Sequence, residues 1–352
     1  MTAPADGRPL RALVLTTSAP RSADDYAGTF VLEMAEALRA QGVDSQIAAL
    51  SAPPGGALAA ARSGLRGRLS LLGPLVRWGV HAWALGRGDA DVTLAHWLVP
   101  SVFGARPGRP VVGVAHGSDA SLLAGRPWLA RAAFARLSGL IVVSEVLRDQ
   151  LRLDPVIAGR VRTLVMPMGV RKGVERDRAM SGSLEVLFVG RLIRAKGLSV
   201  LLEAVRGLAG VRLTVIGDGP DGPPLATENV LWLGRRSPME VLEIMARSDV
   251  VCVPSLGPEG MPRAALEAAA AGCVVIGTPV GGLASWLPPE CTVPVGDSAA
   301  LRRALLRASR GELPLPPSVQ DWETQAPMLA RFLQEVAFSD AHAAGSGVGC
   351  PR

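Results

Sequence analysis

Two glutamates eight positions apart, Glu259 and Glu267, lie on either side of the expected start of a helix. An apolar run predicts a strand over 250–253, a loop rich in proline and glycine follows, and a helix is expected to begin with Pro262 as its first residue. Glu259 then lies on the loop, and Glu267 about one turn inside the helix. A helix N-terminus attracts phosphate, and carboxylates accept hydrogen bonds from sugar and ribose hydroxyls.

This segment resembles the donor-site motif of the retaining glycosyltransferases of family four, which have the GT-B fold. The resemblance implies that Glu259 contacts the transferred sugar and that Glu267 holds the ribose. We place Gly260 and Met261, which follow the first glutamate, beside the diphosphate. The alternative is that Glu259 is a solvated loop residue and Glu267 a residue of the polar helix face, as would be usual for an isolated pair of acids. The strand, the loop, the proline and the helix stop at Gly272 together favour the site.

Two cations follow the first strand expected in the back half of the chain, over 185–189: Arg191 and Lys196. A nucleoside diphosphate removed from water needs such charges, because a buried unpaired anion is very costly. The segment matches the diphosphate-binding arginine and lysine of the same family. Incidental cations on a surface loop are the alternative, although Lys196 is one of only two lysines in the chain.

Strand ends elsewhere carry further candidates for the same cleft. His116 and Asp119, in His-Gly-Ser-Asp, resemble the acceptor-domain loop that faces the transferred sugar, so we expect His116 to act on the sugar or on developing charge. His96, at the end of the preceding strand, is expected to be structural rather than catalytic. The glycines at possible cleft-lining positions are Gly28, Gly190, Gly217, Gly281 and Gly282. For Gly28 a simple helix-entry turn is an equal alternative, and Gly217 is favoured as a turn residue.

Two other patterns are rejected. Asp89 and Asp91 imitate the metal-binding acid pair of the other glycosyltransferase fold, but they precede a strand instead of ending one. With no other acid cluster, we expect no metal and no cofactor besides the donor, and Arg191 and Lys196 take the place of the metal. The three glycines of 217–222 fit a dinucleotide fingerprint, but prolines directly after them prevent the helix that should follow.

Strands and helices alternate along the chain, which predicts an α/β protein with parallel sheets covered on both faces. The expected strands are 10–16, 45–50, 92–96, 110–115, 140–143 and 161–166, then 185–189, 212–216, 230–233, 249–253 and 274–277. Two doubly wound, Rossmann-like domains of the GT-B type would face each other across a cleft. We expect an acceptor domain over 1–172, a linker over 173–183, a donor domain over 184–318, a crossover helix over 319–338 that returns to the first domain, and a disordered tail over 339–352.

Charge is unevenly distributed. The first 171 residues carry 19 arginines and 12 acids, whereas the remainder is close to neutral. An anionic partner such as a membrane surface or a phosphate-bearing acceptor suits the basic half, and nucleic acid does not, because no basic run carries aromatics for stacking. Residues 62–87 mix arginines, leucines and two tryptophans; they would either lie on an anionic bilayer or, as we favour, pack beneath the first sheet.

No signal sequence, spanning segment of about 18 apolar residues, or paired metal spacing among the four cysteines is recognisable. We therefore expect a cytoplasmic protein, at the inner face of the membrane if it meets a lipid, that is a monomer or a weak oligomer.

The resemblance implies a retaining, metal-independent glycosyltransferase that uses a nucleoside-diphosphate sugar and a lipid-linked or polysaccharide acceptor. No side chain stands out as a nucleophile, so a front-face reaction is expected. A GT-B sugar-nucleotide epimerase and a non-catalytic scaffold are the alternatives. One departure concerns the family's common Asn-Gly-Val-Asp, which is Met-Gly-Val-Arg over 168–171 here, and it leaves the identity of the sugar open.

Overall fold

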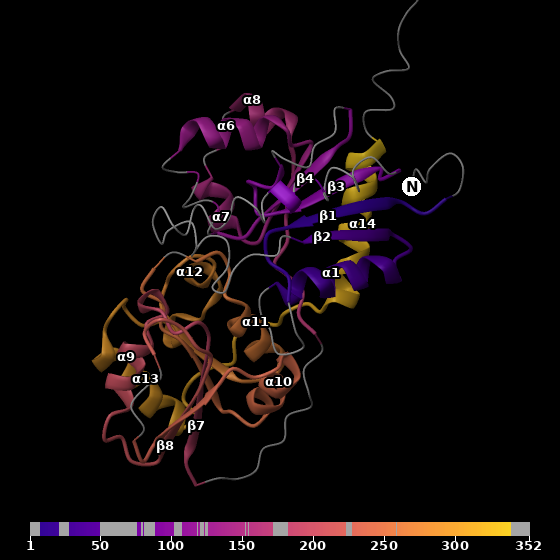
Figure 1. The fold of residues 1–352 in the computed structure, drawn as a ribbon. Helices are drawn as coiled ribbons and strands as arrows, with labels where there is room; N and C mark the ends of the chain where they lie inside the picture. The colour runs from indigo at the N-terminus through magenta and orange to yellow at the C-terminus, as the bar shows by residue number, and fades with distance from the viewer. Residues whose placement is uncertain are drawn as a thin grey trace, which may run out of the picture.

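The computed structural model describes residues 8–20, 28–49, 76–78, 80, 89–101, 108–117, 119, 123, 126–151, 153, 155–171, 182–222, 227–257 and 259–338. These residues form two parallel β-sheets in two lobes that meet along one side, as Figure 1 shows. The expected strand–helix alternation over two domains is confirmed. The observed strands begin and end within one residue of the predicted ranges.

The first sheet has six parallel strands in the order β2-β1-β3-β4-β5-β6. They are β1 (Arg11–Thr16), β2 (Asp44–Ala49), β3 (Val92–His96), β4 (Val111–Ala115), β5 (Gly139–Val142) and β6 (Arg162–Val165). Its main helices are α1 (Thr29–Ala40), α6 (Pro127–Ala135), α7 (Glu145–Gln150) and α8 (Pro155–Arg160). Every residue of β3, β4 and β5 is buried, as expected for central parallel strands that are covered on both faces.

The second sheet has five parallel strands in the order β11-β10-β7-β8-β9. They are β7 (Leu184–Val189), β8 (Val211–Ile216), β9 (Val230–Gly234), β10 (Val250–Val253) and β11 (Val274–Gly277). The helices are α9 (Leu198–Val205), α10 (Pro238–Ala246), α11 (Arg263–Ala270), α12 (Leu283–Trp286) and α13 (Ser298–Ser309), with a short 3-10 turn, η1, at Arg194–Lys196. One core joins α9 and α13 to one face of the sheet, and a second core joins α10 and α11 to the other.

The last helix, α14 (Trp322–Phe338), returns to the first lobe. It lies beside α1 and the first sheet in Figure 1, and its buried residues Leu329 and Leu333 belong to the core of that lobe. The expected crossover helix is therefore confirmed in type and destination. The segment that precedes it bridges to the exit of β6 through Val170 and Asp321, so the two connections between the lobes run side by side.

One local expectation is wrong. Pro262 is not the first residue of α11 but the residue before it: its ψ of 120° is extended, and the helix begins at Arg263. Proline satisfies this position equally well, because it too requires no N–H donor.

Several predicted features fall wholly or largely outside the described residues: most of 62–87, residues 173–181 of the linker predicted over 173–183, and the tail over 339–352. Within 62–87, Trp78 is buried and its Nε1 donates to the Ala48 carbonyl oxygen at 3.1 Å, so this residue packs against the first lobe. The proposed domain boundaries stay predictions. Among the helices that the structure describes, none is long and apolar enough to cross a membrane.

Candidate functional site

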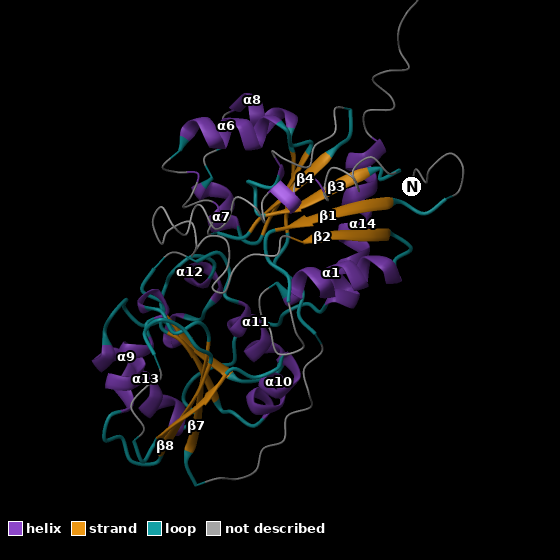
Figure 2. Cartoon of the chain, viewed as in Figure 1, coloured by secondary structure: helices purple, strands orange, loops and turns teal. Residues whose placement is uncertain are grey.

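The site forms where the carboxyl ends of the two sheets face each other. In the second sheet, β10 lies between β11 and β7, so the loops that follow these three strands are neighbours. Figure 2 shows loops from both lobes filling the region between the sheets. Parallel α/β sheets bind ligands at this edge, because all their strands end there.

Glu259 and Lys196 come together at this edge. Lys196 Nζ donates to Glu259 Oε2 at 2.8 Å, and the hydroxyl of Ser255 donates to Oε1. Ser255 is held in turn by Thr278, whose hydroxyl donates to its carbonyl oxygen at 2.7 Å. The Lys196 and Glu259 side chains are 25% and 13% exposed. An ammonium has three donors, so Lys196 can keep this contact and still bind a phosphate oxygen.

Glu267 lies one turn inside α11 and is held by a residue of the same helix. Arg263 donates to Oε1 of Glu267 from Nη2 at 2.6 Å and from Nε at 3.0 Å. Both donors go to one oxygen, which leaves Oε2 available for a ligand hydroxyl. The i, i+4 spacing of the pair places the two side chains on one face of the helix.

The start of α11 offers backbone donors. The N–H groups of Arg263 and Ala264 precede the first intrahelical bonds, and no side chain caps them. The backbone N–H groups of Gly260 and Met261 also donate to no main-chain oxygen of the residues that the structure describes. This is the arrangement that binds a phosphate at a helix N-terminus.

The two lobes touch through main chain at Gly117 and Gly260. A Cβ on Gly117 would lie 2.3 Å from the Gly260 nitrogen, and a Cβ on Gly260 would lie 2.1 Å from the His116 carbonyl oxygen. Gly117 also has a φ of 104°, which side chains rarely adopt. Because Gly260 directly follows Glu259, this contact brings the His116 loop of the first lobe against the donor loop of the second.

His116 is paired with His96 at the ends of β4 and β3. Nδ1 of His96 lies 3.0 Å from Nε2 of His116, and the two rings are nearly parallel. Burial lowers the pKa of His116 to about 3, and burial together with the nearby His116 ring lowers the pKa of His96. Both imidazoles are therefore neutral at pH 7, so His116 offers a hydrogen bond to a substrate instead of a positive charge.

Aromatic rings surround this histidine pair. Phe30 of α1 and Trp97 each lie 4.9 Å from the His116 ring, measured between ring centroids. Trp97 has a φ of 63°, a left-handed conformation that is costly for a bulky residue and often found at functional sites.

Asp119 holds the His116 loop through hydrogen bonds to its backbone. Its Oδ1 accepts from the backbone N–H of His116 at 3.1 Å and of Gly117 at 2.8 Å. Burial raises the pKa of Asp119, although these backbone donors oppose the shift. Its carboxyl group therefore holds the loop instead of facing a ligand.

Arg191 occupies the expected position after β7 and is exposed, but it forms no ion pair within the part of the chain that the structure describes. The candidate glycines pack against other parts of the main chain. A Cβ on Gly28 would meet Ser18, one on Gly217 would meet Gly190, and those on Gly281 and Gly282 would meet the segment 259–261. Their close approach is thus to the protein itself, and direct contact of these glycines with a ligand stays a prediction.

Two models of known protein families match the chain. Glycosyltransferase Family 4 matches residues 27–170, and Glycosyl transferases group 1 matches residues 183–310, so that together they cover well over half of the sequence. The chain belongs to the group 1 glycosyltransferases of family four. Its activity is therefore that of a glycosyltransferase, as the motifs predicted.

Individual relatives of this glycosyltransferase agree. It is 27% identical to a phosphatidyl-myo-inositol mannosyltransferase of Mycobacterium leprae, over 88% of this chain and 92% of the relative. It is 30% identical to the amylovoran biosynthesis glycosyltransferase AmsK of Erwinia amylovora, over 48% and 47%.

Solved structures confirm the predicted GT-B fold of the glycosyltransferase. The sucrose-phosphate synthase of Thermosynechococcus elongatus superposes with a TM-score of 0.65 at 18% identity, over 96% of this chain and 98% of that one. Anabaena Alr3699/HepE in complex with UDP-glucose gives a TM-score of 0.60 at 16% identity, over 96% and 100%.

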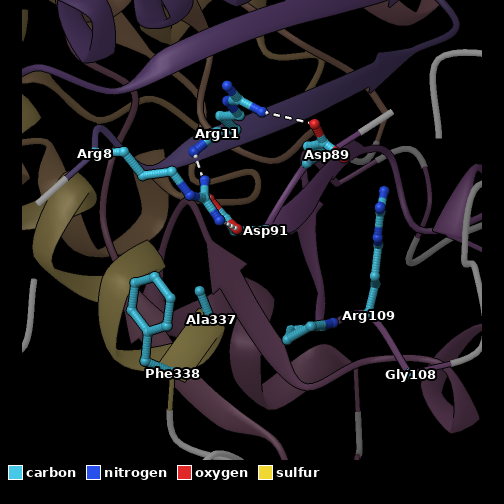
Figure 3. A pocket seen from close by; sticks show the side chains of 10 residues that line it. Arg8, Arg11, Asp89, Asp91, Gly108, Arg109, Ala337 and Phe338 are labelled. Atoms are coloured by element: carbon cyan, nitrogen blue, oxygen red, sulfur yellow. Dashed lines mark hydrogen bonds and ion pairs between the residues drawn. The ribbon is translucent and has the colours of Figure 1, made fainter. Parts of the chain in front are cut away.

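The acid pair near the start of β3 belongs to another part of the glycosyltransferase. A cavity of about 590 Å³ lies at the amino ends of the first sheet's strands, the edge opposite the donor loops (Figure 3). Arg8 donates to both oxygens of Asp91, and Arg11 pairs with Asp89 at 3.0 Å. These ion pairs join β1 to the start of β3. Within the described ranges, no group of three or more potential metal ligands occurs.

Four residues were not singled out from the sequence as parts of the site: Ser255 and Arg263, which contact Glu259 and Glu267, and Glu33 and Trp322, which are linked to Glu267 through Arg263. Arg263 was recognisable, because it lies four residues before Glu267 on the predicted helix. Ser255 had a weaker signal as a hydroxyl residue in the donor loop. Glu33 and Trp322 had none, because their contacts join segments that are more than 200 residues apart in the chain.

Proposed function

We propose that this glycosyltransferase is retaining and metal-independent, and that it moves a sugar from a nucleoside-diphosphate sugar to a lipid-linked or polysaccharide acceptor. The observation that carries the proposal is the fixed Lys196–Glu259 pair, in contact with the His116 loop of the opposite lobe. It sets a cation and a hydroxyl-binding carboxylate within 2.8 Å of each other at the edge where ligands of such sheets bind.

In this proposal, Lys196 and Arg191 hold the diphosphate together with the backbone donors at the start of α11. They stabilise the charge that develops on the leaving phosphate, which is usually the largest single contribution to such catalysis. Glu267 accepts hydrogen bonds from the ribose, while Glu259 and the neutral His116 bind hydroxyls of the sugar. A leaving phosphate that is neutralised in this way can accept the proton of the acceptor hydroxyl on the same face, so the anomeric configuration is kept.

The named relatives support the donor and acceptor classes. One structural neighbour was solved with UDP-glucose, which is a nucleoside-diphosphate sugar. The Mycobacterium relative is named for transfer to a phosphatidyl-inositol lipid, and the Erwinia relative for synthesis of a polysaccharide. These two names support a lipid-linked or polysaccharide acceptor for this glycosyltransferase.

The proposal is tested by finding the donor and following its fate. Uridine, guanosine and adenosine diphosphate sugars are screened by thermal shift, and one of them is expected to raise the Tm. That donor is then incubated with lipid extracts in EDTA, and release of free nucleotide is expected to continue. NMR of the glycosidic product should show the anomeric configuration of the donor.

Each other outcome contradicts a different part of the proposal. Stabilisation without turnover would favour a non-catalytic scaffold, and conversion of the donor sugar into its epimer would favour an epimerase. Loss of transfer in EDTA that Mg²⁺ restores would refute metal independence, and an inverted product would refute the retaining mechanism.

We further propose that the basic first lobe contacts an anionic membrane surface. Trp128, on α6, has 70% of its surface exposed and lies between the exposed residues Arg126 and Arg131. An interfacial tryptophan flanked by cations is typical of proteins that lie on anionic bilayers. The excess of arginine in this half of the chain supports the same partner.

Trp128→Ala is expected to reduce binding to vesicles that contain anionic lipid by about fivefold, because the ring no longer enters the interface. Vesicle flotation at low and high salt measures the effect. Leu315→Ala is the matched control, since Leu315 is 59% exposed but lies on the second lobe. Wild-type protein that fails to float with anionic vesicles at low salt would refute the membrane contact.

A further inference from the structure

A buried carboxylate, Glu33 of α1, is the meeting point of several segments. The residue is 6% exposed. Its Oε2 accepts from Arg263 Nη2 at 3.0 Å and from Trp322 Nε1 at 3.3 Å, and its Oε1 lies 3.3 Å from Arg171 Nε. Two guanidinium groups and one indole therefore satisfy a single acid that would be very costly to bury alone.

These contacts lie at the two connections between the lobes. Arg171 belongs to the exit of β6, and Trp322 begins the crossover helix α14. The backbone N–H of Trp322 donates to the Val170 carbonyl oxygen at 3.3 Å. A Cβ on Gly169 would lie only 2.5 Å from the Trp322 ring. Both crossing segments are thus packed together directly at Glu33, where any change in the angle between the lobes must be accommodated.

Arg263 extends this cluster into the donor site. The same Nη2 that donates to Glu33 also donates to Glu267, which joins a first-lobe acid to a second-lobe acid through one planar guanidinium. The Arg263 side chain also lies over the Phe30 ring, 5.6 Å from its centroid. Burial alone would lower the pKa of Arg263, but the two carboxylates raise it, so the bridging charge is permanent.

Arg171, in the segment of 168–171 that departs from the family pattern, pairs with the buried Glu33. The family commonly has an aspartate at this position, which would set a carboxylate beside the carboxylate of Glu33. Here the arginine neutralises Glu33 instead, so that the two acids Glu33 and Glu267 face the two cations Arg171 and Arg263.

We propose that Glu33 and Arg263 are positioning residues for Glu267, and that they fix the carboxylate that receives the ribose to the junction between the lobes. This inference rests on the proposed function, which assigns the ribose to Glu267. Arg263 holds Oε1 of Glu267, and Glu33 holds Arg263 in place. Without Glu33, the Arg263–Glu267 pair loses its ion pair to the first lobe, and the remaining carboxylate oxygen of Glu267 is held less firmly in direction.

The test separates ribose recognition from phosphate recognition. Binding of uridine diphosphate, its 2′-deoxy and 3′-deoxy analogues, and inorganic pyrophosphate is measured by calorimetry for wild type, Glu33→Gln, Glu267→Ala and the double variant, with the guanosine series in parallel. Glu33→Gln is expected to weaken the ribonucleotide about 10-fold while affinity for the deoxy analogues and pyrophosphate stays within about twofold of wild type. The double variant should bind the ribonucleotide no more weakly than Glu267→Ala.

Two further variants keep the result interpretable. Glu36→Gln is the matched control, because Glu36 lies on α1 one turn beyond Glu33 and is exposed; it should leave all affinities unchanged. If Glu33→Gln does not fold, Arg263→Lys replaces it, since lysine keeps the charge but lacks the fork that reaches both acids. It should lose the same preference for the ribonucleotide.

Two outcomes overturn the inference in distinguishable ways. If Glu267→Ala abolishes the preference for ribonucleotides but Glu33→Gln and Arg263→Lys retain it, the positioning role is wrong and the proposed site stands. If Glu267→Ala itself retains the preference, the assignment of the ribose to Glu267 is wrong, and the positioning role falls with it.

Discussion

Glu259→Gln is expected to lower kcat about 300-fold while the Kd of the nucleoside diphosphate stays the same or falls slightly. Removing one electrostatic group aimed at the reacting centre typically costs a factor of 100 to 1,000 in rate. The nucleotide is spared because glutamine no longer draws the Lys196 ammonium toward itself, which leaves more of that charge for the phosphate. Initial rates over a range of donor concentrations, together with calorimetry of the free nucleotide, measure both quantities.

Glu290→Gln is the control for this variant, because Glu290 is an exposed acid of the same lobe that lies in the turn Pro289–Cys291, after α12. It should match wild type in both measurements. An unchanged kcat in Glu259→Gln would remove Glu259 from the reaction, and a large loss of nucleotide affinity without loss of kcat would move it to the nucleotide part of the site.

Lys196→Met is expected to weaken binding of the nucleoside diphosphate about 50-fold. A hydrogen bond to a charged group contributes about 1.5–3 kcal/mol, which corresponds to roughly 10- to 150-fold in affinity. The largely buried Glu259 also loses its cation and then repels the incoming phosphates. Methionine preserves the unbranched stem of lysine, so the packing of the loop changes little.

The loss in Lys196→Met should depend on the phosphates. The diphosphate is expected to lose more affinity than the monophosphate, and the nucleoside should be unaffected, as competition binding will show. Lys196→Arg, which retains the charge, should recover part of the affinity. Equal losses for nucleoside and diphosphate would mean that Lys196 supports the pocket without contacting phosphate.

The order of elements was accessible from the sequence because strands buried on both faces are short apolar runs, and this chain separates them with clear turn residues. The donor loop could also be placed, since β10, Glu259 and α11 are consecutive in the chain. Contacts made at long range could not be predicted in this way. The pairing of Glu33 with Arg263 spans 230 positions and depends on the angle between the lobes, which no local pattern encodes.

The Pro262 prediction failed for a different physical reason. A proline next to a helix start fits either the first helical residue or the residue before it, because neither position needs its N–H. The conformation is then decided by how the loop must approach the opposite lobe. Two residues earlier, Gly260 lies so close to the His116 carbonyl oxygen that no Cβ would fit between them.

The contact between Gly117 and Gly260 sets the shortest distance that evolution or design can give the two lobes at the site. Both residues are glycines, so no side chain remains to be shortened, and any Cβ added here would push the two lobes apart. A narrower site for smaller acceptors must therefore come from the surrounding loops, because the two lobes cannot approach more closely at this contact.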